Sequence, residues 1–339
     1  MSRILAALCL VVFGAVPDQR ADAIRHAKVW MPVNVKSMNL KAGPQGPLAF
    51  PPEATVTCTY FEADLGQGST PKFHCMMPTG AIGRELKVRY GKTNGEVYAQ
   101  VAATRLLWAL GFPADPMYPV KVACRGCSAD PFNTRPPVDA TAAVTFDPAT
   151  IDEDFPGTTI ENSSGQGWAW KELDHVDPQA GGATLAERDA FKLLAAFIQH
   201  SSNKSINQRI VCVNPPSCST TVMMIGDLGK TFGRANSGND DAIGSVNFAA
   251  WSREPIWKGA VACVANLHWT WSGSLSDPMI SEAGRKFLVD LLDQLTDGQL
   301  TDLFTVARFT ERDHSATVAQ WVDAFKAKRA EITNRKCGS

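Results

Sequence analysis

The chain has 339 residues and a net charge of −1, from 33 Lys and Arg against 34 Asp and Glu. A nearly neutral chain gives no electrostatic reason to expect binding to nucleic acid or to an anionic membrane surface. Its length and its 45% hydrophobic residues allow one large two-lobed domain or two ordinary domains.

The first 23 residues have the pattern of a secretory signal peptide. Arg3 precedes an apolar run over residues 4–16, which is shorter than the ~17–25 residues that span a bilayer. Small residues at positions 21 and 23 predict cleavage before Ile24. An uncleaved anchor is the alternative. With cleavage, the protein would be secreted or periplasmic and would keep no membrane segment.

Eight cysteines remain after the predicted cleavage, and an even number in an exported chain favours disulfides. Residues 54–61 and 72–77 have the alternation of two strands. If they pair as a hairpin centred between Gly66 and Gln67, Cys58 lies opposite Cys75, close enough for a disulfide.

The other pairs follow from proximity along the chain. Cys124 and Cys127 form a Cys-x-x-Cys sequence, and Cys212 lies six residues before Cys218. We expect each pair to be a structural disulfide, with a zinc site made by all four cysteines as the alternative. Cys263 and Cys337 remain, and we expect them to pair by elimination.

The predicted elements follow in chain order. Residues 24–53 are rich in Pro and Gly and predict an irregular segment. After the first two strands come a strand over 85–90, a helix that Asn94 begins and Gly111 ends, and a strand over 117–124. Residues 128–166, rich in Pro, Ser, Thr and Asp, predict an irregular insertion or linker, and 167–173 predict a short alternating strand.

The second half is mostly helical in pattern. Thr184 and Glu187 form a capping box that predicts a helix to about residue 199. Strands over 209–213 and 221–225 follow, and then helices over 281–295, 297–308 and 315–332.

One stretch carries residues suited to chemistry. His200, Lys204 and Asn207 precede the strand pair, and Asp227 with Gly229 follows it. The Asn amide oxygen and the Asp carboxylate are hard oxygen ligands of the kind that Mg²⁺ takes. A buried Asp after an apolar strand is costly unless it is paired or metal-bound, although Asp also occurs simply as a turn residue.

The spacing of these residues resembles that in the protein-kinase-like superfamily, which includes atypical kinases and pseudokinases. The chain also resembles an exported bacterial protein. In that superfamily a His-x-Asp-x-Lys-x-x-Asn loop precedes an Asp-Phe-Gly turn. The resemblance implies an α+β, two-lobed kinase-like fold, stapled by disulfides. A small antiparallel-sheet N-lobe (54–127) would precede the insertion (128–166) and a mostly helical C-lobe (167–339).

The resemblance also implies roles for single residues. Lys87, on the third strand, would bind the α- and β-phosphates of ATP, and Glu96, in the first turn of the next helix, would position it. Gly66 and Gly68 would form a short glycine-rich loop over the phosphates. The plainer interpretations are a solvated lysine, a first-turn glutamate favoured by the helix dipole, and an ordinary glycine turn.

The resemblance extends to the helical half. Lys204 would contact the nucleotide, while Asn207 and Asp227 would hold Mg²⁺. The segment 167–173 would lead into the hinge, with Trp168 or Trp170 covering the adenine. Aromatic residues at that spacing are also common in cores.

Ser202 stands where kinases carry the catalytic Asp, and a hydroxyl does not accept a proton as a carboxylate does. Three outcomes follow: His200 or Asp227 orients the acceptor, the chemistry differs, as in AMP transfer, or the protein is a pseudokinase that binds nucleotide or a protein partner without turnover. The alternative from another class is a disulfide-stabilised binding or structural module without a nucleotide site.

Overall fold

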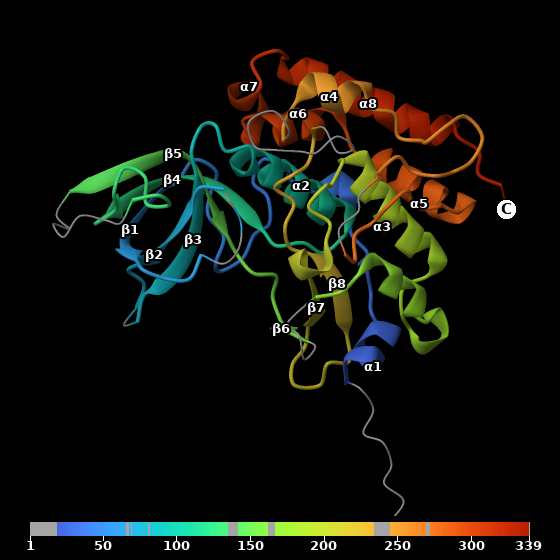
Figure 1. Ribbon diagram of the computed structural model, residues 1–339, viewed down its shortest axis with the longest axis horizontal. Helices are drawn as coiled ribbons and strands as arrows, with labels where there is room; N and C mark the ends of the chain where they lie inside the picture. The colour runs from blue at the N-terminus through green and yellow to red at the C-terminus, as the bar shows by residue number, and fades with distance from the viewer. Residues whose placement is uncertain are drawn as a thin grey trace, which may run out of the picture.

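The computed structural model describes residues 19–65, 68, 70–80, 82–134, 142–161, 167–233, 245–268 and 272–338. A sheet-rich lobe stands beside a mostly helical lobe, and the long helix α2 (Glu96–Leu110) lies where the two meet (Figure 1). The α+β, two-lobed fold class predicted from the sequence is therefore confirmed.

The sheet lobe is a closed five-stranded barrel in the order β1-β2-β3-β5-β4. Its strands are β1 (Thr55–Phe61), β2 (Lys72–Met77), β3 (Arg84–Tyr90), β4 (Met117–Arg125) and β5 (Ala143–Asp152). Neighbours pair antiparallel except β1 and β4, whose parallel pairing closes the barrel. Alternate side chains fill the interior, because successive residues of a strand face opposite sides.

Two predictions about the middle of the chain are wrong. Residues 128–166 are not an irregular insertion, because β5 lies within them and pairs with both β3 and β4. Residues 167–173 do not form a strand; Trp170–His175 form the 3₁₀ helix η2 instead. Trp168 and Trp170 are buried in the helical-lobe core, so they do not cover a ligand.

The first hairpin is offset from its predicted register. Tyr60, and not Cys58, lies opposite Cys75, which moves the centre of the hairpin by one position. The disulfide nevertheless forms, with 5.6 Å between the two Cα atoms. Both cysteines are buried in the barrel core, so strand alternation brings them to the same side despite the offset.

In its described residues the helical lobe contains seven further helices, a small sheet and short 3₁₀ turns. The helices are α1 (Gln19–Arg25), α3 (Leu185–Phe197), α4 (Phe248–Arg253), α5 (Glu282–Leu292), α6 (Asp297–Val306), α7 (Phe309–Arg312) and α8 (Val318–Asn334). The sheet has the order β6 (Thr158–Thr159), β7 (Gln208–Cys212), β8 (Thr221–Ile225). The turns are η1 (Val35–Ser37), η3 (Pro178–Ala180) and η4 (Ser205–Asn207).

Capping side chains fix where the main helices begin. The predicted capping box at α3 is present: Thr184 accepts from the backbone of Glu187, and Glu187 accepts from the backbone of Thr184. Thr296 and Thr317 make the same arrangement at α6 and α8. Each box satisfies helix N–H groups that would otherwise lack a partner.

Helix α1 overlaps the end of the predicted signal peptide. Arg20 forms an ion pair of 2.7 Å with Glu172, and Ala23 and Ile24 are buried in the helical-lobe core. Cleavage before Ile24 would remove Arg20 from this contact. The apolar run over residues 4–16 lies outside the described residues. No helix in the described part of the chain is long and apolar enough to cross a membrane.

The irregular segment after α1 connects the two lobes. Trp30 donates to the carbonyl of Leu110 at the end of α2. Arg105, fully buried in α2, donates to the carbonyls of Leu40 and Lys41. The segment 24–53 has no regular helix or strand apart from the end of α1 and the η1 turn, and its contacts hold α2 in place.

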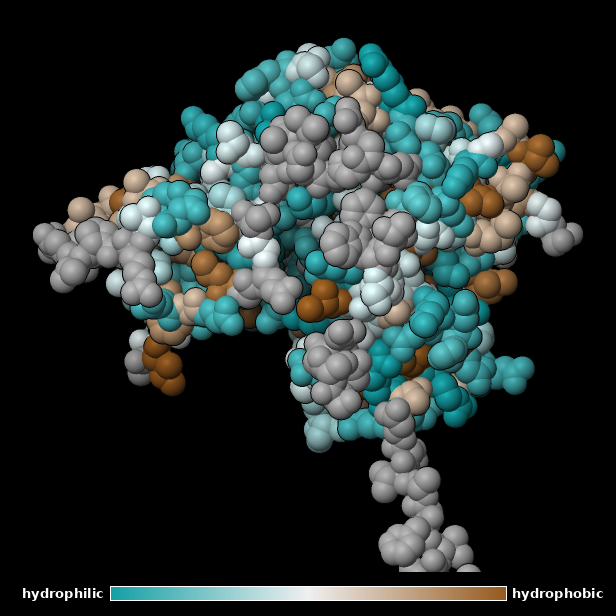
Figure 2. All heavy atoms as spheres, viewed as in Figure 1, coloured by the Kyte–Doolittle hydropathy of each residue, from teal (hydrophilic) through white to brown (hydrophobic). Residues whose placement is uncertain are grey.

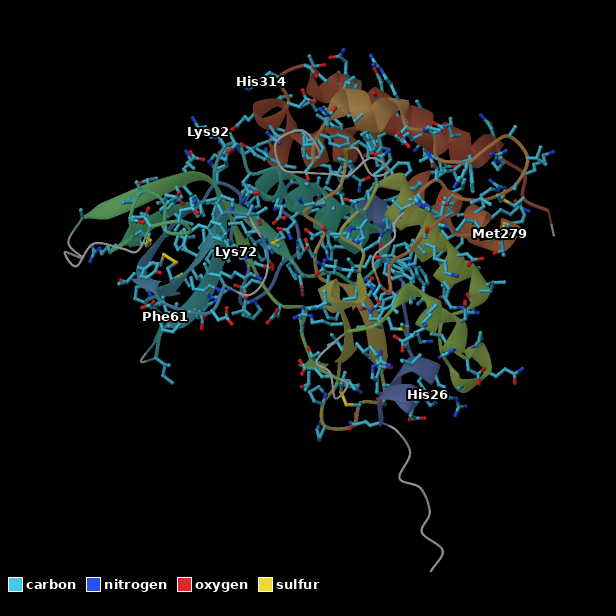
Figure 3. The ribbon with its side chains drawn as sticks, in the orientation of Figure 1. His26, Phe61, Lys72, Lys92, Met279 and His314 are labelled. Atoms are coloured by element: carbon cyan, nitrogen blue, oxygen red, sulfur yellow. A yellow bond between two sulfur atoms is a disulfide. The ribbon has the colours of Figure 1, made fainter. Side chains whose placement is uncertain are left out.

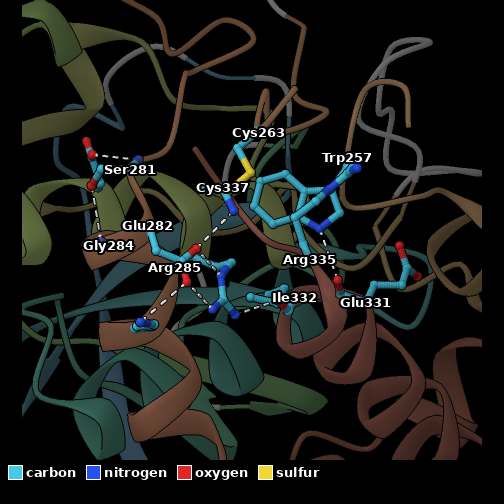
Figure 4. Close-up of a disulfide and its surroundings, with 12 residues drawn as sticks. Trp257, Cys263, Ser281, Glu282, Gly284, Arg285, Glu331, Ile332, Arg335 and Cys337 are labelled. Atoms are coloured by element: carbon cyan, nitrogen blue, oxygen red, sulfur yellow. Dashed lines mark hydrogen bonds and ion pairs between the residues drawn. A yellow bond between two sulfur atoms is a disulfide. The ribbon is translucent and has the colours of Figure 1, made fainter. Parts of the chain in front are cut away.

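All four predicted cysteine pairs are disulfides: Cys58–Cys75, Cys124–Cys127, Cys212–Cys218 and Cys263–Cys337. This pairing replaces the zinc alternative. The last disulfide ties the C-terminus down beside α5, where the backbone N–H of Cys337 also donates to Glu282 (Figure 4). Glu282 in turn holds Arg285, which donates to the carbonyl of Ile332 at the end of α8.

Candidate functional site

A polar cleft of about 800 Å³ opens between the two lobes. Figure 2 shows the hollow between the sheet lobe and the helical lobe, with hydrophilic residues around it. Among the described residues, its charged lining has four basic and seven acidic side chains. These are Lys72, Lys87, Arg89, Arg209, Glu85, Glu96, Asp115, Asp152, Glu153, Asp154 and Asp227.

Glu96 lies at the inner end of this cleft, in the first turn of α2. The helix begins here because Asn94 accepts a hydrogen bond of 3.1 Å from the Glu96 backbone, although the N-cap position itself is Gly95. The buried Glu96 carboxylate accepts from Thr70 at 2.9 Å and from Arg89 at 2.6 Å. A charged bond of this kind fixes the carboxylate in one position.

The cation bound to Glu96 differs from the expected one. The resemblance assigned that position to Lys87, but Arg89 occupies it, two residues further along β3 and on the same face. Lys87 instead forms an ion pair of 3.1 Å with Asp152, and 39% of its side chain is exposed. It still lines the cleft, nearer to solvent than Arg89.

Lys72, the first residue of β2, is a cleft residue that the sequence analysis missed. It lies directly opposite Arg89 in the β2–β3 pair and is only 3% exposed. Figure 3 places it at the end of its strand that faces the helical lobe. The sequence signal was a second lysine at the start of a predicted strand, beside the glycine-containing turn.

The surroundings of Lys72 lower its pKa from the usual value of a lysine. Burial lowers the pKa of Lys72, and the nearby Arg89 lowers it further, while Glu96 and Asp227 raise it. Gly68 lies against the ammonium group, because a Cβ there would be 2.9 Å from the Lys72 Nζ. Gly68, between β1 and β2, therefore lies over the amine. Gly66, its other predicted glycine, lies outside the described residues.

Asn207 and Asp227 meet on the opposite wall, just before β7 and just after β8. The Asn207 amide nitrogen donates to Asp227 at 3.2 Å and to the carbonyl of Ser202 at 2.7 Å. Because the nitrogen makes both bonds, the amide oxygen is the atom available to a cation. Each oxygen of Asp227 accepts one hydrogen bond, from Asn207 or from the Gly229 backbone, and keeps further acceptor capacity.

The loop that carries Asn207 is held from below. Asn203 is fully buried and donates to the carbonyl of His200 at 2.6 Å. It accepts from the Leu275 backbone, and its own carbonyl accepts from Trp170. Three hydrogen bonds of Asn203 therefore fix the backbone of the loop near the cleft.

His200 does not reach the cleft. Its side chain is fully buried, and burial lowers its pKa to about 4, so the imidazole is neutral at neutral pH. Neither ring nitrogen has a hydrogen-bond partner among the described residues. A fully buried side chain cannot contact a substrate, so His200 serves in the core and not in the cleft. Ser202 and Lys204 line a smaller hollow that continues from the cleft.

The donor set fits a hard divalent cation. The Asn207 amide oxygen and the Asp227 carboxylate lie side by side, which suits Mg²⁺ bound by one or two protein ligands together with phosphates and water. No group of three or more His, Cys, Asp or Glu among the described residues forms a metal site on its own. The excess of carboxylates in the cleft disfavours a bare polyanion and favours a metal complex.

No family model matches the chain, and no curated protein does. Among solved structures the chain is similar to the proinflammatory kinase CtkA of Helicobacter pylori. The TM-score is 0.42 with 10% sequence identity, over 84% of this chain and 95% of that chain.

Proposed function

We propose that the cleft binds a nucleoside triphosphate with Mg²⁺, and that the protein is an exported, atypical kinase-like phosphotransferase. The observation that carries the proposal is the direct contact of Asn207 with Asp227 across the cleft from Lys72 and Arg89. In this arrangement the two metal ligands would lie on one side of the cleft and the two basic side chains on the other. A triphosphate with its Mg²⁺ could then bind between them.

Each side chain has a role in that arrangement. Lys72 would bind the phosphates, with Gly68 leaving room for them to approach and Lys87 assisting from the rim. Glu96 would orient this group through Arg89. Asn207 and Asp227 would hold the metal, which neutralises charge on the phosphates during transfer. Fixed charges of this kind stabilise the transition state because they need no reorganisation.

Export of the protein is part of the proposal. Four disulfides form and persist most readily in an oxidising compartment, which supports a secreted or periplasmic location. It also follows that nucleotide must reach the protein outside the cytosol.

Thermal unfolding of the oxidised protein tests the proposal. ATP with Mg²⁺ at a hundred times its Kd should add about 2.7 kcal/mol to the free energy of unfolding. The matched control is Asp227→Asn, which keeps the size of the side chain and removes its charge. An upshift that requires both Mg²⁺ and Asp227 supports the proposal. Equal stability with and without nucleotide would instead favour a binding module without a nucleotide site.

A further inference from the structure

A second hollow of about 380 Å³ continues from the cleft into the helical lobe. Glu96, Asn207 and Asp227 line both spaces, so the proposed metal ligands stand between them. The inner hollow adds Lys204 and Lys230, which belong to the loop after α3 and the turn after β8. It is the space that an acceptor would occupy beside a nucleotide in the main cleft.

Among the described residues that line this inner hollow, none is placed to remove a proton from an acceptor. Its carboxylates, among the described residues, are Glu96 and Asp227. Glu96 is held by Arg89 and Thr70. Asp227 accepts two hydrogen bonds and would also face the metal. The histidine nearest in sequence, His200, is sealed in the core.

A hydroxyl acceptor must lose its proton during phosphoryl transfer, whereas a carboxylate, with a pKa near ~4, is already ionised at neutral pH. Two lysines in the hollow would attract and hold such an anion. The two lysines and the absence of a placed base among the described lining residues therefore indicate the same class of acceptor.

We infer that the inner hollow binds a small carboxylate, which accepts the γ-phosphoryl group; this inference rests on the proposed function. A carboxylate oxygen forms a bond to the γ-phosphorus as the bond from that phosphorus to the β–γ bridging oxygen breaks. The bonding electron pair leaves with the nucleoside diphosphate. The products are an acyl phosphate and the diphosphate, and no proton needs to move.

The test uses the full oxidised protein with MgATP, hydroxylamine and, in separate reactions, acetate, succinate or glutamate at high concentration. Hydroxylamine converts an acyl phosphate into a hydroxamate, which ferric iron colours. We expect hydroxamate and ADP in equal amounts. The rate of their formation should not change between about pH 6 and pH 8, because this transfer needs no general base. Acetate is small enough to enter any carboxylate-binding hollow of this volume, so its failure together with the other two counts against the inference.

Lys230→Gln separates the acceptor from the nucleotide. It should raise the KM for the carboxylate about tenfold, while the Kd of MgATP stays the same. The thermal shift with MgATP is measured in parallel. If MgATP stabilises the wild-type protein but no carboxylate promotes ADP release, this inference is overturned while the nucleotide site is retained. Phosphate found on Ser202 or on an alcohol acceptor also overturns it. If MgATP does not stabilise the wild-type protein, the proposed function is overturned.

Discussion

The backbone of Gly229, which follows β8, lies against the side chain of Glu96 at the start of α2, although the two residues are far apart in the sequence. A Cβ at position 229 would be 2.5 Å from the Glu96 Cγ, closer than real side chains approach. Gly229 also donates its N–H to Asp227. One glycine thus connects the proposed metal ligand with the carboxylate that anchors Arg89, so the two walls of the cleft are positioned together.

Gly229→Ala should disturb both walls. The added methyl group has no room, so Glu96 must move away from Arg89 and Thr70, at a cost of about 1–3 kcal/mol in the free energy of unfolding. Urea unfolding measures this cost. Gly46→Ala is the matched control, because a Cβ there meets nothing within 4 Å. Equal stabilities of the two variants would contradict the close contact.

Lys72 and Lys87 should differ in their importance for nucleotide binding. Lys72 is buried between the acidic groups and beside Gly68, whereas Lys87 is 39% exposed and its interactions are screened by solvent. Lys72→Met should raise the Kd of MgATP at least about tenfold, which corresponds to about 1.4 kcal/mol. Lys87→Met should raise it much less. Calorimetric titration decides, and the reverse order would return the phosphate-binding role to Lys87.

His200 should make stability depend on pH. Its folded-state pKa is lowered to about 4, while an unfolded histidine titrates near ~6.5. Between these values the unfolded chain binds more protons, so stability is complete above about pH 6.5 and falls as the pH drops toward 4. The loss attributable to His200 is on the order of 3 kcal/mol.

His200→Leu removes this proton uptake and should flatten the stability curve in that pH window. His26→Gln, at a partly exposed position, controls for the loss of a histidine. Curves that stay parallel for wild type and His200→Leu would mean that the imidazole is not sealed from water.

The disulfides should differ in their contribution to stability. Cys263 and Cys337 are 74 residues apart, whereas Cys212 and Cys218 are six apart. In the chain-entropy model their removal costs about 4 and about 2 kcal/mol respectively. Urea unfolding of the two paired Cys→Ser variants measures both costs. A larger loss at the short pair would show that local packing, and not chain entropy, sets the contribution.

The sequence predicted the elements that local patterns determine. The strand over 72–77 and the start of α3 at Thr184 were predicted exactly, because alternation and a capping box act within a few residues. The cysteine pairs were predictable for a similar reason, because three of the four pairs are close in sequence or lie on neighbouring strands. Strand β5 was missed because its segment is rich in proline and polar residues and has no clear strand pattern. Pairing with a distant strand, β4, stabilises it.

The site was only partly predictable from the sequence. Asn207 and Asp227 were identified by their residue types and spacing, and the structure brings them into contact. Lys72 was missed because its burial depends on Arg89 across the hairpin and on the turn at Gly68, and neither contact is visible in a linear pattern. His200 matched a motif by position, but burial decides its chemistry.

The most direct test of the account measures the Kd of ATP by calorimetry with Mg²⁺ and with EDTA, in wild type and in Asn207→Leu. The account predicts that Mg²⁺ tightens binding at least about tenfold in wild type and has little effect in the variant, which lacks the amide oxygen. Binding that is absent, or equally tight with and without Mg²⁺, would contradict a metal–nucleotide site in this cleft.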